Sequence, residues 1–461
     1  MNLNACFADA SLGLPEDVRH LKEAGYFDEA IRLLDRRMAA ESSDRMRRNY
    51  LVQREILVRM PHEYPYTMEE GLARVREAIP DFTMAELRDY MDSGRITWHF
   101  VDGEKHLISS FFGTLEKTVP AFAARLPKKP EAAEPQSHEL LDRTGRLNRS
   151  VTVMREKGSM SARIRMRAML RVKDSSFVPG ETYRVWLPIP AACIQQSGIE
   201  LLGFSSPPTR VAEEDAAQRT VFWEEKMTEN HPFWVEYAYT HTAPYADPLA
   251  LRADPVHPDF DTGEIAPHVV FTPYIRALCD ELTRGVTDPV EKARRFYDYV
   301  TTKVTYSFVP DYFTMDSIAE TCLRTRRGDC GVQALAFITL CRCAGIPAKW
   351  QSGLVADPES VGSHDWAMFY VAPHGWLFAD PSFGGSAYRA GAPARHRHYF
   401  GNLDVYRCVT VNGYQQPYDP AMRFWRHDPY DNQVGEVEDS KRGYRRFEVE
   451  HDTEMLEFRE L

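Results

Sequence analysis

The spacing of hydrophobic and polar positions divides the chain into three parts. Through residues 1–126, apolar residues recur at the helical period, and this predicts helices over 16–24, 27–38 and 44–58, the last ending before Pro61. Two short helices follow, each opened by the Thr-x-x-Glu pattern of a capping box, at Thr67 and at Thr83. Alternating residues on both sides of Asp102-Gly103 then predict a β-hairpin. The first part is therefore expected to be mostly helical.

A change of period marks the second part. Residues 127–137 are rich in proline and charge and are predicted to be a linker. In 163–172, apolar residues alternate with arginines, which predicts a long strand with one basic face. Further strands are expected over 183–188, 219–223 and 233–240, so 138–250 reads as a β-rich module, a small antiparallel sandwich. The arginine face either binds an acidic partner or is simply solvated, and the second interpretation is preferred.

The third part, residues 251–430, mixes both periods. Pro273 and Pro289 each stand at the first position of a predicted helix, and the second helix leads to a strand over 304–308. An apolar helix is expected from the region of Cys330 to Cys343, followed by strands over 348–355, 365–371 and 376–380. The segment 431–461 is charged and is expected to form edge strands or to be only partly ordered. The whole chain is thus predicted to be an α+β protein.

Composition narrows the possible roles. A chain of 461 residues can hold two or three domains, and a net charge of −11 argues against general nucleic-acid binding, which needs a basic surface. Neither an 18-residue apolar run nor a secretory signal pattern is present, so the expected location is cytoplasmic, without membrane association. Eight cysteines in this length do not suggest a disulfide scaffold.

The strongest chemical signal is the order of one cysteine, one histidine and one aspartate. Cys330 follows the turn-forming pair Gly328-Asp329 and opens an apolar helix, where backbone N–H groups and the helix dipole favour an anion. His364 and Asp380 follow on neighbouring strands of a hairpin, so antiparallel pairing can bring them together. A thiolate nucleophile needs a lowered pKa, which a helix N-terminus and an imidazolium both supply.

Four motifs in this order resemble the core of the transglutaminase-like superfamily, which includes transglutaminases, bacterial cysteine peptidases and peptide N-glycanases. They are Gly-Asp-Cys ending at Cys330, Gly-Ile-Pro-Ala at 345–348, His-Asp-Trp from His364, and Gly-Trp-x-x-x-Asp-Pro around Asp380. The resemblance spans roughly residues 270–410. It implies a papain-like core, in which the helix bearing the cysteine packs on an antiparallel sheet.

The resemblance also assigns roles. It implies that Cys330 is the nucleophile, His364 the general base and acid, and Asp380 the carboxylate that orients the histidine. A further oxyanion donor is expected upstream of the cysteine, and Tyr306 is the candidate. No metal or organic cofactor is implied.

Other residues compete for these roles less well. His374 lies in a hairpin turn, and Asp365 is next to His364 but should point to the opposite face of its strand. The remaining rivals are better explained as core or surface residues than as a resolving thiol or a metal pair: Cys322, Cys341, Cys343, His396 and His398.

Three functions therefore stay open. In the first two, Cys330 attacks an amide and forms a thioester. Water resolves the thioester in a peptidase or amidase, which is favoured for a small core of bacterial type, and an amine resolves it in a protein-glutamine transglutaminase. The third is a non-enzymatic binding scaffold that keeps the triad as a relic. The expected partner is a protein or peptide substrate, and residues 1–126 are expected to act separately from the chemistry.

Overall fold

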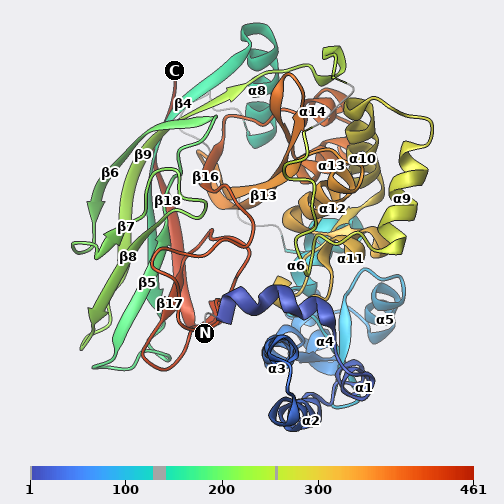
Figure 1. Cartoon of the computed structure of the whole chain (residues 1–461), viewed down its shortest axis with the longest axis vertical. Helices are drawn as coiled ribbons and strands as arrows, with labels where there is room; N and C mark the ends of the chain where they lie inside the picture. Colours follow the sequence, from blue (N-terminus) through green and yellow to red (C-terminus); the bar gives the residue numbers. More distant parts are fainter. Residues whose placement is uncertain (1–2, 128–141, 255–257) are drawn as a thin grey trace.

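The computed structural model describes residues 3–127, 142–254 and 258–461, and its parts form three neighbouring regions (Figure 1). The N-terminal helices lie at the bottom of the view, two β-sheets at the left, and the mixed core at the right. The predicted α+β class is confirmed. Nearly all of the predicted linker, from residue 128, falls outside the described residues. Within the described residues, no helix has both the length and the apolar character needed to cross a bilayer.

The N-terminal region is helical as predicted, with a small three-stranded sheet in the order β1-β3-β2. Both capping boxes are present, because Thr67 and Thr83 each accept the backbone N–H of a glutamate that returns the bond. Asp102 and Gly103 have φ of 50° and 80°, as a type I′ turn requires. The elements are η1 (Leu3–Leu12), α1 (Glu16–Ala24), α2 (Phe27–Ala40), α3 (Asp44–Glu63), β1 (Tyr66–Thr67), α4 (Met68–Arg76), α5 (Met84–Asp92), β2 (Trp98–Val101), β3 (Glu104–Leu107), α6 (Phe111–Thr118) and α7 (Pro120–Ala123).

One helix boundary was predicted wrongly. The helix α3 continues through Pro61 to Glu63 instead of ending before the proline. Proline removes one backbone bond near the end of the helix, but Leu57 and Met60 are buried there, and this packing offsets the lost bond.

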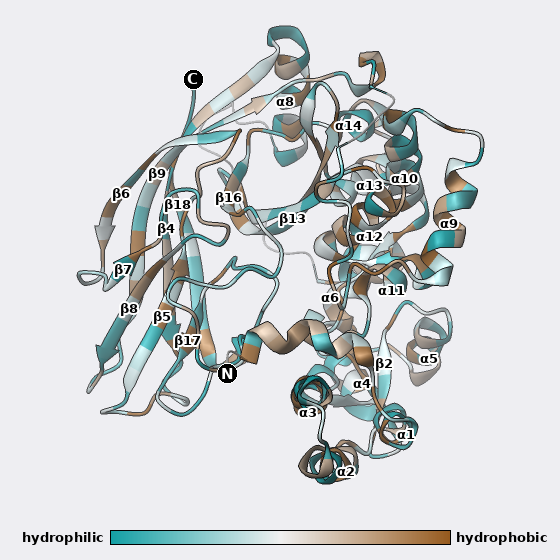
Figure 2. Ribbon diagram, in the orientation of Figure 1, coloured by the Kyte–Doolittle hydropathy of each residue, from teal (hydrophilic) through white to brown (hydrophobic). Residues whose placement is uncertain are grey.

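Two four-stranded sheets make the β-rich module, in the orders β17-β5-β8-β7 and β18-β4-β9-β6. Hydrophilic and hydrophobic bands are mixed along β4 and β9 (Figure 2), and buried positions alternate with more exposed ones along β4, as its period-two pattern predicts. The helix α8, which the sequence analysis did not predict, precedes the first strand. The elements are α8 (Arg143–Lys157), β4 (Ser159–Val172), β5 (Thr182–Pro188), β6 (Gln196–Phe204), β7 (Arg210–Val211), β8 (Thr220–Lys226), β9 (Phe233–Pro244), η2 (Pro248–Ala250), β17 (Glu436–Glu438), η4 (Arg446–Glu448) and β18 (Val449–Glu460).

The charged segment after residue 430 forms edge strands, one of its two expected outcomes. β18 pairs with β4 from Val449↔Val172 to Glu460↔Ala162, and β17 pairs with β5. The outward arginines of β4 meet carboxylates: Arg165 and Arg167 pair with Glu236, and Arg163 pairs with Glu200. The basic face is thus neutralised within the module.

The core is a five-stranded sheet in the order β15-β14-β13-β12-β16, with α12 packed against β12 and β13. A separate pair, β10 and β11, runs parallel just before α12. The elements are α9 (Pro273–Thr283), α10 (Pro289–Lys303), β10 (Thr305–Tyr306), η3 (Tyr312–Thr314), α11 (Ile318–Thr325), β11 (Arg327–Gly328), α12 (Cys330–Cys343), β12 (Ala348–Asp357), β13 (Ser360–Val371), β14 (Gly375–Ala379), α13 (Pro381–Arg389), α14 (Pro393–His398), β15 (Phe400–Gly401) and β16 (Arg407–Val411).

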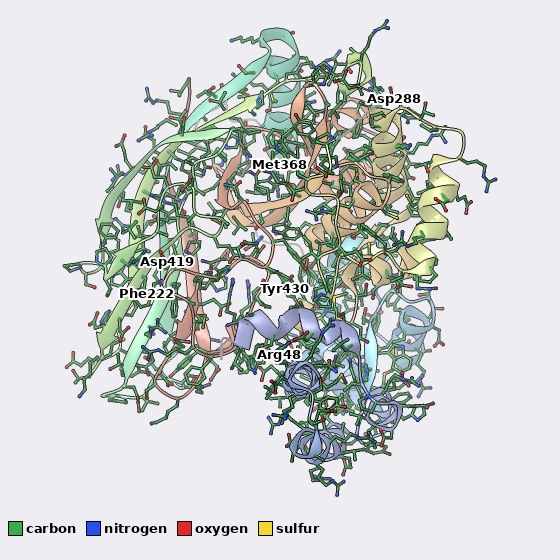
Figure 3. All side chains as sticks on the ribbon, in the orientation of Figure 1. Arg48, Phe222, Asp288, Met368, Asp419 and Tyr430 are labelled. Carbon is green, nitrogen blue, oxygen red and sulfur yellow. The ribbon has the colours of Figure 1, made fainter. Side chains whose placement is uncertain are left out.

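The N-terminal helices share a hydrophobic cluster with the core. Phe7 packs its ring against Phe313 at 4.8 Å and against Tyr430 at 5.3 Å, and Figure 3 shows Tyr430 beside η1. The buried Arg59 of α3 donates to Asp311 at 3.0 Å and to the carbonyl of Arg426 at 2.6 Å. Separate action of residues 1–126 stays a prediction, and this shared packing speaks against it.

Candidate active site

Cys330 opens α12 as predicted. Asp329 caps the helix, since its Oδ1 accepts the N–H of Val332 at 3.1 Å and also the hydroxyl of Tyr312. Parallel pairing of β10 with β11 sets Tyr306 opposite Gly328, two residues before the cysteine. The turn and cap before α12 therefore fix the position of Cys330 at the start of the helix.

Gly331 explains how closely the helix start approaches the sheet. A Cβ at this position would lie 2.4 Å from the hydroxyl of Tyr312 and 2.8 Å from both Oδ2 of Asp365 and the ring of Trp350. Any larger residue would push the first turn of α12 away from β13. Glycine after Cys330 thus holds the thiol against this strand.

His364 and Asp380 meet as the hairpin predicts. β13 and β14 pair with Ala367 opposite Ala379, and Nε2 of His364 lies 2.7 Å from Oδ2 of Asp380. Asp380 also caps α13 through the N–H of Phe383 at 2.8 Å. The strand starts at Ser360, so His364 lies within β13 rather than at its start, which corrects that boundary.

A buried guanidinium completes this pair. Nη2 of Arg407 lies 3.0 Å from Oδ2 of Asp380 and 2.6 Å from Asp404. Burial alone would raise the pKa of Asp380, but His364 and Arg407 together bring it below its ordinary value. Burial lowers the pKa of His364 in spite of Asp380, so the imidazole is neutral at neutral pH. Nothing in the sequence pattern pointed to Arg407.

The thiol rests against a different side chain. Sγ of Cys330 lies 3.3 Å from Oδ2 of Asp365, and no hydrogen bond between Cys330 and His364 occurs among the described residues. Both residues nevertheless line one pocket of about 200 Å³, together with Tyr306 and Lys117. The structure therefore brings His364 and Asp380 into direct contact, and Cys330 and His364 to the same cavity.

This surrounding corrects the expected acidity of the thiol. Burial raises the pKa of Cys330 well above its usual value, and Asp365 and Asp329 raise it further. The pKa of Cys330 is thus raised and that of His364 lowered, so the resting pair is a neutral thiol and a neutral imidazole. A neutral thiol needs a base before it can act as a nucleophile.

Asp365 is a site residue whose contact with the thiol the sequence pattern did not predict. As predicted, it does not partner His364: its Oδ2 accepts the Cys330 thiol and its Oδ1 accepts the amide of Gln433. Burial raises its pKa to about 7. The strand alternation that excluded it from the histidine side was the signal that could have placed it near α12.

Tyr306 lines the cavity of Cys330, with the ammonium of Lys117 3.7 Å above its ring. Burial, then Cys330 and Asp329, raise the pKa of Tyr306, so its hydroxyl stays protonated and can donate a hydrogen bond. Its position is compatible with the expected oxyanion donor.

The other histidines and cysteines considered for the site have structural partners or are buried. His374 bonds the carbonyl of Arg252 at 2.9 Å, and His398 bonds that of Leu403 at 3.1 Å. His396 meets Thr301, and both Cys322 and Cys341 are buried. Within the described ranges, no three His, Cys, Asp or Glu side chains gather as they would around a metal ion.

Comparison with known proteins agrees with this geometry. Residues 276–381, which contain Cys330, His364 and Asp380, match the sequence model of the core of the transglutaminase-like superfamily. This segment is therefore similar to a transglutaminase-like core, and the match does not extend to the rest of the chain.

Two curated relatives match part of the chain. The uncharacterised protein YebA of Bacillus subtilis is 22% identical, over 24% of this chain and 17% of its own length. The protein-glutamine gamma-glutamyltransferase of Pseudomonas aeruginosa is 25% identical, over 30% of this chain and 22% of its own length. The chain thus aligns with about a fifth of either relative.

Two solved structures are similar over larger shares. A candidate cysteine protease from Cytophaga hutchinsonii is 14% identical, with a TM-score of 0.41 over 65% of this chain and 91% of that one. The periplasmic domain of TgpA from Pseudomonas aeruginosa is 17% identical, with a TM-score of 0.27 over 54% of this chain and 96% of that one.

Proposed function

We propose that this protein is a cysteine enzyme that cleaves or transfers an amide acyl group through a thioester on Cys330. The observation that carries the proposal is the His364–Asp380 pair, at 2.7 Å, in a protein whose Cys330 opens a helix in the same cavity as the histidine. A cysteine, a histidine and a carboxylate in this order are the parts of a nucleophile, a base and the group that orients the base.

The ring of His364 has a defined direction in this proposal. Nε2 faces Asp380, so Nε2 carries the proton and Nδ1 is left to accept the thiol proton. The thiol of Cys330 turns from Asp365 toward Nδ1, loses its proton, and attacks the amide carbon. The oxyanion receives hydrogen bonds from the backbone of the first turn of α12 and from the hydroxyl of Tyr306.

Collapse of this intermediate completes the first half of the reaction. Nδ1 of His364 returns its proton to the leaving amine as the C–N bond breaks, and a thioester remains on Cys330. Water, activated by the same nitrogen, then attacks the thioester, and the acid leaves while the thiol is restored. Hydrolysis is the favoured outcome; attack by a lysine amine in place of water gives a transglutaminase.

The relative named protein-glutamine gamma-glutamyltransferase supports the transfer alternative, but it shares only part of its length with this chain. Protein or peptide amides are the proposed substrates in both cases. A cytoplasmic location stays part of the proposal, as does the absence of nucleic-acid and membrane partners.

A product analysis tests the proposal. The protein is incubated with a mixed peptide library, with and without a lysine analogue, and cleaved, deamidated and cross-linked products are identified by mass spectrometry. Wild type should give products and a thioester adduct on Cys330, while Cys330→Ala should lose about 10⁴-fold or more in turnover. Absence of any adduct in wild type would leave the binding scaffold as the better account.

A further inference from the structure

A larger cavity opens beside the one that holds Cys330. Its volume is about 540 Å³, within the range of ligand-binding clefts. The two cavities share lining residues, so they adjoin, and an extended substrate bound at the thiol lies next to the larger space. The shared residues are Lys117, Arg143, Tyr306, Ser382 and Phe383.

The charge of this larger cavity, here called the cationic cleft, has one sign. Its lining includes four cations, Lys117, Arg143, Arg389 and Arg395, and no aspartate or glutamate. They come from α6, the start of α8, the end of α13 and α14. Hydroxyl groups of threonines and serines add hydrogen-bonding capacity around them. The protein as a whole carries −11, so this cluster stands out against its net charge.

Rings and carbonyls, rather than carboxylates, hold these cations. Lys117 lies 3.7 Å above the ring of Tyr306, and Arg143 lies 5.6 Å from the ring of Phe383. Arg389 donates to the carbonyl of Val304 at 3.3 Å, and the buried Nε of Arg395 has no hydrogen-bond partner among the described residues.

Ion pairing elsewhere makes the contrast clear. In the parts of the chain that the structure describes, none of the four cleft cations forms an ion pair with a carboxylate, whereas Arg165 and Arg167 of β4 both pair with Glu236. Uncompensated charges around a cavity that adjoins the pocket of Cys330 favour an anionic group from outside.

We propose that the cationic cleft is a specificity subsite for the acidic part of the substrate. The proposal rests on the function above: the scissile amide lies at Cys330, and a stretch of the same peptide bearing several carboxylates lies along the cleft. The guanidinium groups of Arg143 and Arg389 bind carboxylates with paired N–H donors, and Lys117 adds a charge where the cleft meets the catalytic pocket. An acidic peptide is therefore the preferred substrate class.

Binding tests the subsite without relying on turnover. A fluorescent peptide with a Gly-Gln-Gly core and three glutamates is titrated into full-length Cys330→Ala, and the counterpart carries glutamines in place of the glutamates. The acidic residues are placed before the core in one pair and after it in another, and amidated and free C-termini distinguish side-chain from terminal carboxylates. We expect the acidic peptide of at least one pair to bind about 10-fold or more tightly, by fluorescence anisotropy. The preference should shrink as salt rises from about 0.05 M to about 0.5 M.

Matched variants locate the preference. Arg143→Gln and Arg389→Gln in the same background should each reduce the ratio of the two affinities by about 3-fold, and the double variant should bring the ratio close to one. Lys157→Gln, at the other end of α8 from Arg143, removes an exposed positive charge outside the cleft and should leave the ratio unchanged. Circular dichroism checks that each variant is folded.

The results separate the two proposals. Equal affinities for both peptides of every pair, or an equal loss in the Lys157 variant, would overturn the acidic subsite whatever the enzyme does. A clear preference together with an unlabelled Cys330 in wild type would keep the subsite and remove the proposed chemistry.

Discussion

Adjacent residues of β13 face two different electrostatic surroundings. On one side, His364 meets Asp380, whose charge Arg407 compensates at 3.0 Å. On the other side, Asp365 meets the thiol of Cys330, and close to it lies the carboxyl of Asp431. The histidine side is a chain of paired charges, and the aspartate side is a concentration of acids.

The difference separates the behaviour of two buried aspartates. The pKa of Asp380 lies below its ordinary value because His364 and Arg407 outweigh burial, and the pKa of Asp365 rises to about 7 because burial is not compensated. One carboxyl is thus ionised beside a histidine, and the other titrates near neutrality. Both residues are buried aspartates, so the difference between their pKa values comes from the neighbouring charges.

Removing His364, the proposed base, should have the largest effect on activity. We expect His364→Ala to lower kcat/KM by about 10³- to 10⁴-fold, because His364 is the proposed base for the thiol proton and the proposed acid for the leaving amine. Initial rates on a peptide found in the product screen measure the loss. His374→Ala is the control and should be near wild type; a loss in that variant, with His364→Ala active, would exchange the two assignments.

Neutralising the orienting carboxylate should do less harm. Asp380→Asn keeps the reacting groups but weakens the hold on Nε2 of His364, so its kcat should stay about 100-fold above that of His364→Ala. Steady-state kinetics measures this, with urea unfolding to show that the variant is folded. If the two variants were equally inactive in a folded state, Asp380 would have to take part in the reaction itself.

Substitution on the aspartate side should change pH dependence more than rate. Asp365 has a raised pKa in the folded state, so its contribution to stability is complete below its ordinary pKa of 3.8 and is lost as pH rises to about 7. In wild type the free energy of unfolding should therefore fall across this window, and Asp365→Asn should reduce the fall by at most a few kcal/mol. Urea unfolding at a series of pH values measures it, with the exposed Asp215→Asn as control.

Asp365→Asn should also change the pH at which the Cys330 thiol reacts. An ionised Asp365 raises the pKa of Cys330, so its removal should let Cys330 react with iodoacetamide at a lower pH than in wild type. Mass spectrometry of Cys330 across a pH series follows this change. An unchanged profile would mean that burial and Asp329, and not Asp365, control the acidity of the thiol.

The parts of this site that could be predicted depend on short-range patterns. Gly-Asp before Cys330 specifies a cap and a helix start, and the hairpin between β13 and β14 specifies that His364 meets Asp380. The raised pKa of Cys330 could not be predicted, because the dipole of α12 is visible in the sequence whereas burial against Asp365 is a tertiary property. The position of Lys117 and Arg143 at one cavity could not be predicted either, because they belong to separate elements that only the tertiary fold brings together.

The strand β18 has a consequence for how the chain is made. The ribosome releases β4 long before β18, because the whole catalytic core lies between them in the sequence. At about 5–20 residues per second, one edge of β4 waits on the order of tens of seconds for its partner. An unpaired edge invites aggregation, and outward charge protects it. The arginines of β4 supply that protection, and the register then sets Glu457 opposite Arg165 and Glu454 opposite Arg167. The charged face of β4, which could be taken for a binding surface, thus helps to keep this edge from aggregating until β18 pairs with it.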